Sequence, residues 1–172
     1  MEILIAGVIL VALMVWASTR IKRSAAAAFE AETIDTAEFT LKKPTGWLSK
    51  VEPAKPYLFE AYTRDLGNPP HENIRLGTAS IEASKGTIDE IANRMIEEGE
   101  VTDDIREIVS ETHYRVIELT RPDGEIERLE WLKFGQTDGS VYTFWVKALA
   151  DTTPEFRRDI EAMIDSFELK II

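Results

Sequence analysis

Hydrophobic and polar positions divide the chain into one uninterrupted apolar segment near the N-terminus and a longer region of alternating patterns. Residues 3–19 carry no charge, and nine of these 17 residues are Leu, Ile or Val. As a helix the segment would measure about 25 Å, slightly less than a hydrocarbon core of roughly 30 Å. Arg20 and Lys22 follow it, and long basic side chains can reach the lipid surface from such a position. The pattern predicts a membrane-spanning helix.

The charges around this segment distinguish a retained anchor from a cleaved export signal. An export signal has basic residues before its apolar core, whereas here the basic residues follow it. We therefore expect a retained single-pass anchor, with a cleaved signal as the alternative. Basic flanks stay in the cytoplasm, which places the N-terminus outside and the C-terminal domain inside at the cell (inner) membrane. A periplasmic domain is the alternative orientation. The anchor residues are Ile3, Leu10, Trp16, Arg20, Lys22 and Arg23.

The change in pattern after the basic residues defines three regions. Residues 1–24 form the predicted transmembrane helix and its basic collar. Residues 25–35 are rich in Ala and Glu, which are good helix formers, and predict a helical stalk or linker. Residues 36–172 contain the alternating patterns of a folded domain, so the chain has one compact domain with an N-terminal appendage.

The first part of the domain predicts strands followed by a helix. Alternation predicts strands at residues 37–44, 57–64 and 74–84, and the turn-forming loop "DLGNPPHEN" excludes a tight hairpin between the last two. Thr87 and Glu90 form a T-x-x-E capping box in front of apolar residues at helical spacing. We expect this helix to end at Gly99.

The second part predicts an antiparallel meander and a closing helix. Three strands between Ile105 and Ala150 are separated by the turn signals "PDG" and "TDG", and the last strand is apolar on both faces, which is typical of a central strand. Thr153 and Pro154 predict the start of the final helix, and "FELKII" can add a terminal strand. The expected fold class is α+β, an antiparallel β-sheet sandwiched by helices and preceded by a single transmembrane helix.

Charge and cysteine content narrow the possible functions. The net charge is -11, and the residues after position 24 hold 30 acids against 17 bases. A nucleic-acid partner is therefore not expected, because binding to phosphate backbones requires a basic surface. The chain has no cysteine, which excludes disulfides, cysteine nucleophiles, zinc ribbons and a lipidated cysteine.

Candidate catalytic chemistry is sparse. His71 lies in a loop beside Glu72, where a solvated side chain is the simpler interpretation and a metal ligand the alternative, and His113 lies within a predicted strand. No nucleophile elbow, P-loop, dinucleotide fingerprint or zinc motif is present. Glu118, Glu125, Glu127 and Glu130 alternate along strands, a pattern typical of a solvated sheet face. We predict no catalytic, cofactor-binding or metal residues and no enzyme activity, with an unrecognised acidic site as the alternative.

The order of elements, the motif "PTGW" (Pro44–Trp47) and the closing "MIDSFEL" (Met163–Leu169) resemble the PsbP-like domain family. Over roughly residues 36–170 this resemblance implies the PsbP-like α/β sandwich, shared by an extrinsic photosystem II subunit, DcrB-type envelope proteins and a Ran-binding regulator. It implies a non-catalytic accessory or assembly role on a larger complex. The chain departs from the family because it carries a predicted membrane anchor and no cysteine for lipidation.

These observations lead to one functional hypothesis and one alternative. The first is an accessory subunit that is held in the lipid bilayer by its N-terminal helix and docks on an integral membrane protein complex. The resemblance favours a photosynthetic reaction-centre or light-harvesting complex as this partner. The alternative is a DcrB-type envelope binding or stress-related module facing the periplasm. The candidate interface residues are Trp47, Trp131 and Trp145. For Trp47 a core position is the favoured interpretation and an interface the alternative, and Trp131 and Trp145 can instead pack against each other across neighbouring strands.

Overall fold

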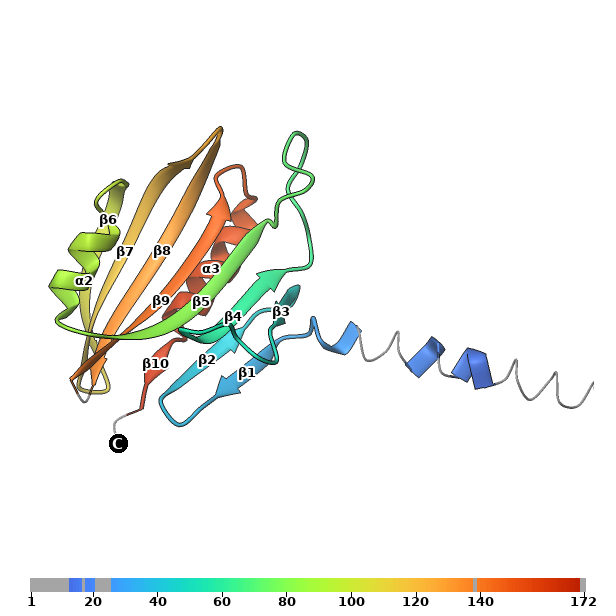
Figure 1. Ribbon diagram of the computed structural model, residues 1–172, viewed down its shortest axis with the longest axis horizontal. Helices are drawn as coiled ribbons and strands as arrows, with labels where there is room; N and C mark the ends of the chain where they lie inside the picture. The colour runs from blue at the N-terminus through green and yellow to red at the C-terminus, as the bar shows by residue number, and fades with distance from the viewer. Residues whose placement is uncertain (1–12, 17, 21–25, 138, 171–172) are drawn as a thin grey trace, which may run out of the picture.

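The computed structural model describes residues 13–16, 18–20, 26–137 and 139–170. Its main element is a seven-stranded antiparallel sheet with the strand order β3-β4-β5-β9-β8-β7-β6, shown in Figure 1. The strands are β3 (Trp47–Ser49), β4 (Tyr57–Thr63), β5 (Gly77–Lys85), β6 (Glu100–Val109), β7 (Thr112–Asp123), β8 (Ile126–Thr137) and β9 (Ser140–Leu149). The predicted central strand is β9, which lies between β5 and β8.

A three-stranded sheet of order β1-β2-β10 lies beside the large one. It consists of β1 (Glu32–Asp35), β2 (Phe39–Lys43) and β10 (Glu168–Leu169), so the terminal strand predicted in "FELKII" is present. β1 corrects the expected extent of the helical stalk. Residues 26–27 are helical, but residues 32–35 pair with β2, where Ile34 packs against the core. Strand pairing and the partial burial of Ile34 outweigh the helix propensity of the Ala and Glu residues that precede it.

Both predicted helices begin where their caps indicate. α2 (Ile88–Met95) has the complete capping box, in which the Thr87 side chain accepts from the Glu90 amide and the Glu90 side chain accepts from the Thr87 amide. It ends at Met95, before the predicted stop at Gly99. α3 (Pro154–Asp165) follows Thr153, whose side chain accepts a hydrogen bond from the amide of Phe156.

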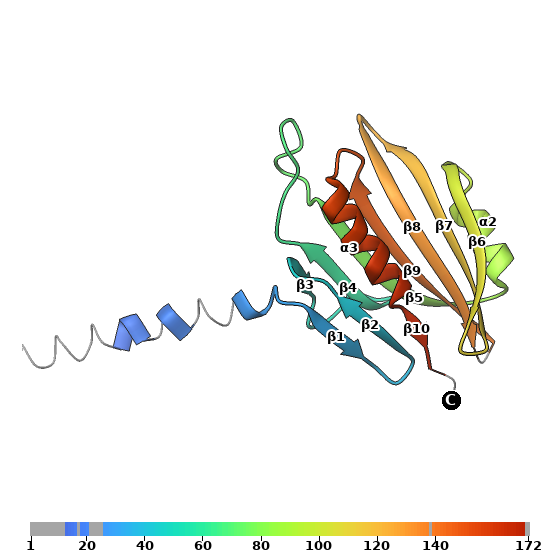
Figure 2. The ribbon, with the colours of Figure 1, turned by 180° about the vertical axis from the view of Figure 1, so that it is seen from behind.

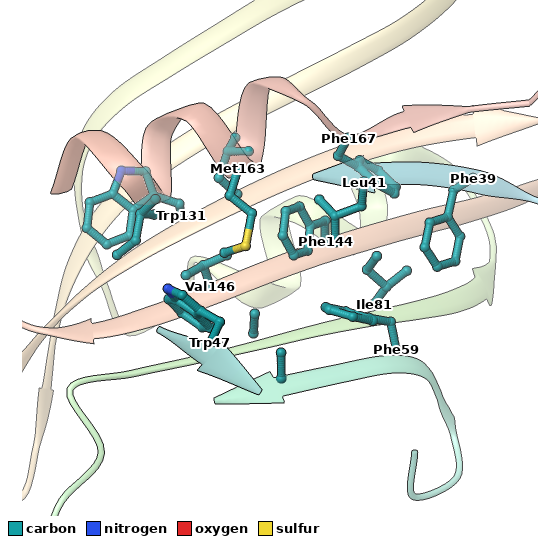
Figure 3. Close-up of a cluster of buried hydrophobic side chains, with 14 of the residues drawn as sticks. Phe39, Leu41, Trp47, Phe59, Ile81, Trp131, Phe144, Val146, Met163 and Phe167 are labelled. Atoms are coloured by element: carbon teal, nitrogen blue, oxygen red, sulfur yellow. The ribbon is translucent and has the colours of Figure 1, made fainter. Parts of the chain in front are cut away.

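The two faces of the large sheet are covered differently, as Figures 1 and 2 show from opposite sides. α3 and the small sheet cover one face and bury the larger apolar cluster. In Figure 3, Trp131, Phe144 and Met163 lie between α3 and the sheet, and Leu41 of β2 lies close to Phe167. α2 lies on the opposite face, where Ile91 and Ala92 pack against residues of β7, β8 and β9. The expected sandwich is therefore present, with a sheet-and-helix layer on one side and a single short helix on the other.

The meander has one more strand than the sequence pattern predicts. The stretch from 106 to 121, expected as one strand, contains the end of β6 and most of β7, which pair as a hairpin. The turn residues are Ser110 and Glu111, with φ angles of 49° and 69°. Such turns normally use Gly, Asn or Asp, so the residue types at this turn carry little signal. The other two hairpins lie at the predicted signals, with positive φ at Gly124 and Gly139.

Most of the predicted membrane anchor lies outside the described residues, including Ile3, Leu10, Lys22 and Arg23. Trp16 and Arg20 are described, are helical and exposed, and the Arg20 guanidinium lies 5.3 Å from the centre of the Trp16 ring. In the described part of the chain, no helix combines the length and apolar character that a membrane crossing requires.

Candidate binding cleft on the open half of the sheet

The short α2 leaves one half of its sheet face uncovered, over β4, β5 and the end of β9. A hollow of about 460 Å³ occupies this half. Its lining includes two tyrosines, a tryptophan and three basic side chains, which are Tyr57, Tyr62, Trp145, Lys50, Arg75 and Lys147. We call this hollow the cleft, and it is the candidate functional site.

Strand register explains why these side chains meet. Tyr62 of β4, Thr78 of β5 and Lys147 of β9 are direct neighbours across three strands, and so are Glu60, Ser80 and Trp145 in the next row. Residues two apart on a strand share a face, so the two rows lie side by side on the cleft floor. Three segments far apart in the sequence therefore form one surface.

Trp145 is held in place by a polar network beneath the cleft. Its Nε1 donates a hydrogen bond to Oε2 of Glu130 at 3.1 Å, and Oε1 of this buried glutamate lies 3.6 Å from Nε of Arg121. The Lys147 ammonium lies 3.6 Å from the centre of the Trp145 ring, on its face. A cation on an aromatic face is favourable, and more so when it is partly desolvated.

Lys147 differs from the other basic residues of the cleft because its ammonium makes neither a hydrogen bond nor an ion pair with any of the described residues. Burial lowers the pKa of Lys147, while the negative charge of Glu130 acts in the opposite direction. The positive charges of Arg128 and Arg121 lower the pKa further. A half-buried cation without an ion pair is poised to accept an anionic group.

The other two basic residues already have partners. Nη1 of Arg75 donates to the backbone carbonyls of Thr63 and Arg64 at 3.1 and 2.9 Å, and its guanidinium lies 4.8 Å from the centre of the Tyr62 ring. Nζ of Lys50 lies 2.7 Å from Oε1 of Glu60, and this hydrogen bond lowers the pKa of the Glu60 carboxyl. Three cations and one carboxylate give the cleft a formal charge of +2.

A second hollow of about 420 Å³ continues from the cleft. It shares Arg75, Thr78 and Lys147 with the first, and adds Asp123 and Arg128. Nε of Arg128 lies 2.7 Å from Oδ2 of Asp123, so these charges are paired. Because both hollows share Lys147, its ammonium lies in the middle of the combined surface.

The three candidate tryptophans have separate positions. Trp47 and Trp131 are 1% and 3% exposed and belong to the core on the α3 side, so neither side chain lies at the surface of the domain. Trp47 stacks on Phe156 with the ring centres 6.0 Å apart and the planes at 4°. Trp131 is paired with Val146 and Trp145 with Leu132, so the two tryptophans lie on opposite faces of the sheet. The predicted contact between them is therefore absent. Of the three, only Trp145 lines the cleft.

The other residues considered from the sequence do not form a site together. His71 lines a separate hollow near Asp151, and His113 is exposed on β7. Glu118 faces α3, where it binds Arg157, whereas Glu130 lies on the opposite face under Trp145. Within the described ranges no group of three or more acidic or histidine side chains is placed to hold a metal ion.

Comparison with known proteins identifies the fold. No protein-family model matches the chain, and no curated protein sequence matches it significantly. The solution structure of cyanobacterial PsbP (CyanoP) from Synechocystis sp. PCC 6803 matches with a TM-score of 0.58 and 14% identity, over 83% of this chain and 94% of that one. The chain has the PsbP-like fold.

Two further structures share the PsbP-like fold. LpqN, involved in cell envelope biogenesis of Mycobacterium tuberculosis, matches with a TM-score of 0.54 and 14% identity over 82% of this chain and 91% of its own. The Ran-binding protein Mog1p of Saccharomyces cerevisiae matches with a TM-score of 0.53 and 8% identity, over 82% of this chain and 96% of its own. At these identities the comparison shows the fold and confirms the structural part of the sequence resemblance.

Sequence reasoning identified one cleft residue, Trp145, and missed Tyr62, Arg75 and Lys147. The only local signal was Lys147 itself, a charge placed directly after the apolar run "VYTFWV" of a central strand. Arg75 comes from the loop before β5, whose path relative to β4 depends on the tertiary fold.

Proposed function

We propose that this protein is a non-catalytic accessory subunit, tethered to a membrane by its N-terminal segment, that binds a larger membrane protein complex through its PsbP-like domain. The observation that carries the proposal is the cleft, an open surface lined mainly by aromatic and basic side chains. Such a surface is suited to binding.

The attachment of the linker supports a role close to the membrane. The carbonyls of Ala28 and Glu30 accept hydrogen bonds from Nζ of Lys43, each at 3.0 Å, and the carbonyl of Phe29 accepts one from the Gly46 amide at 2.7 Å. If the basic collar ends at the membrane surface at Arg23, the five residues to Ala28 span at most about 17 Å. The domain is then held within reach of membrane-embedded neighbours.

The proposal is tested by isolating the full-length protein with a C-terminal tag from its native membrane after mild solubilisation. We expect it to migrate with other proteins in a large assembly, and mass spectrometry then identifies them. A photosynthetic reaction-centre or light-harvesting complex is the specific form favoured by the PsbP resemblance. Migration of the tagged protein alone as a monomer would contradict the accessory role.

Two matched variants test whether the cleft takes part. Tyr62→Ala removes a half-buried ring from the cleft, and Leu66→Ala removes an exposed side chain elsewhere. We expect only the first to reduce recovery of the assembly, because truncation of an aromatic anchor affects binding most. Equal recovery with both variants would place the binding surface elsewhere.

Reporter fusions at the C-terminus test the proposed orientation. The basic collar predicts activity of a cytoplasmic reporter and none from a reporter that works only outside the cytoplasm. The opposite result would favour the envelope-facing alternative.

A further inference from the structure

We propose that the cleft binds an acidic, extended segment of the partner protein, with a carboxylate of that segment paired with Lys147. This inference rests on the proposed function and specifies the chemistry of the partner. It concerns the two adjoining hollows on β4, β5, β8, β9 and the end of β7.

Charge complementarity is the first argument. The chain as a whole has a net charge of -11, yet the cleft has three cations against one carboxylate. An acidic partner is repelled by the net negative charge of this protein and attracted by the basic side chains of the cleft. Such a contrast guides association and disfavours docking at other faces.

The state of Lys147 is the second argument. Arg75 and Lys50 are occupied by backbone carbonyls and by Glu60, whereas Lys147 contacts a ring face and has no ion pair among the described residues. A carboxylate that enters the cleft would form a charge-assisted hydrogen bond with this partly desolvated ammonium. One unpaired ammonium suits one carboxylate, while a phosphate group normally requires several converging free donors.

The arrangement of the floor favours an extended segment. Thr78 and Ser80 place two hydroxyl groups on the same face of β5, about 6.8 Å apart by strand geometry. Alternate side chains of an extended peptide have the same spacing. Tyr62 and Trp145 flank these hydroxyls and provide contact area for the intervening side chains, and the second hollow extends the surface beyond Lys147.

The test uses the full-length protein in phosphatidylcholine nanodiscs and a display library of random dodecapeptides. Selected peptides are synthesised with a fluorescent label, and their dissociation constants are measured by fluorescence anisotropy. We expect selection to enrich Asp and Glu, and replacement of the decisive Glu by Gln in a peptide to weaken binding about tenfold or more, as for loss of a desolvated charge pair.

Three variants locate the interaction. Lys147→Met is expected to weaken binding about tenfold or more, and Thr78→Glu to do the same by placing a carboxylate directly opposite Lys147 in the register. Thr78 is exposed, so this variant is expected to fold even if Lys147→Met does not. Lys85→Met, at an exposed lysine on the same strand outside the cleft, should bind like the unchanged protein.

Two results would overturn the inference. One is a selection without an acidic excess or with peptides that bind Lys147→Met as tightly as the unchanged protein. The other is Lys147-dependent binding of phosphatidylglycerol vesicles without acidic peptides, which would assign the cleft to a lipid headgroup. The isolation experiment is separate: an assembly that persists with Lys147→Met contradicts this inference alone, whereas a protein isolated as a monomer contradicts the accessory role.

Discussion

The buried Lys43 offers a sharp test of how the linker is joined to the domain. Its side chain is 1% exposed, and its ammonium donates to the carbonyls of Trp47 at 2.8 Å and of Ala28 and Glu30 at 3.0 Å. The Glu32 carboxylate lies 3.7 Å away but is largely exposed. Lys43→Met keeps the length of the side chain and removes all three hydrogen bonds.

The expected loss of stability follows from these contacts. A hydrogen bond from a charged donor contributes about 1.5–3 kcal/mol, and this applies most directly to the interior carbonyl of Trp47. The carbonyls of Ala28 and Glu30 belong to exposed residues, so water can replace the lost donor there at about 0.5–1 kcal/mol each. The variant also avoids the cost of burying the Lys43 charge, which offsets part of this loss of stability. We expect Lys43→Met to lower the free energy of unfolding by about 2–4 kcal/mol.

The measurement is denaturant unfolding of the full-length protein in mild detergent, followed by the fluorescence of the buried Trp47 and Trp131. Lys42→Met is the matched control, because Lys42 is the exposed neighbour on the same strand, and we expect a change within about 0.5 kcal/mol. Hydrogen exchange at the Gly46 amide, which donates to Phe29, should accelerate only in Lys43→Met. Equal stability of the two variants would refute the assignment of Lys43 as the link between linker and domain.

Three further predictions concern the domain. Lys147→Met should be at least as stable as the unchanged protein at pH 7, because burial lowers the pKa of Lys147 in the folded state. The stability advantage of the variant should shrink as the pH rises through that lowered pKa. A clear loss of stability at pH 7 would contradict this prediction. The Arg115 hydrogen bond lowers the pKa of Asp104, so its stabilising effect is present above the unfolded value of about 4 and lost as the pH falls through the folded value. When unfolding is measured at decreasing pH, the difference in free energy of unfolding between the unchanged protein and Asp104→Asn should therefore become smaller below about pH 4. A difference that stays constant would refute this. Phe167→Ala should lower the free energy of unfolding by about 3–5 kcal/mol, because the buried Phe167 ring contacts the rings of Phe39, Tyr114 and Phe144. A loss below about 1 kcal/mol in urea unfolding would contradict this, because it would mean that neighbouring side chains fill the cavity.

Local features of the sequence were sufficient wherever short-range physics decides the structure. The capping box at Thr87, the N-cap at Thr153 and the turn glycines 124 and 139 act within a few residues, so their positions were predictable. The turn at Ser110–Glu111 was not, because neither residue type favours positive φ.

Residues far apart in the sequence met only through the tertiary structure. Whether Trp131 and Trp145 share a face depends on a register of one residue between β8 and β9, which the alternation within either strand does not specify. The cleft depends on the placement of α2 over β7 and β8, which leaves Tyr62 and Lys147 uncovered. The α+β class, the helix starts and two of the three hairpin turns of the meander could be read from the sequence alone, because each follows from local hydrogen bonding and hydrophobic period. The position of the cleft and the unpaired state of Lys147 were decided by strand register and by the short length of one helix, both of which arise from long-range packing.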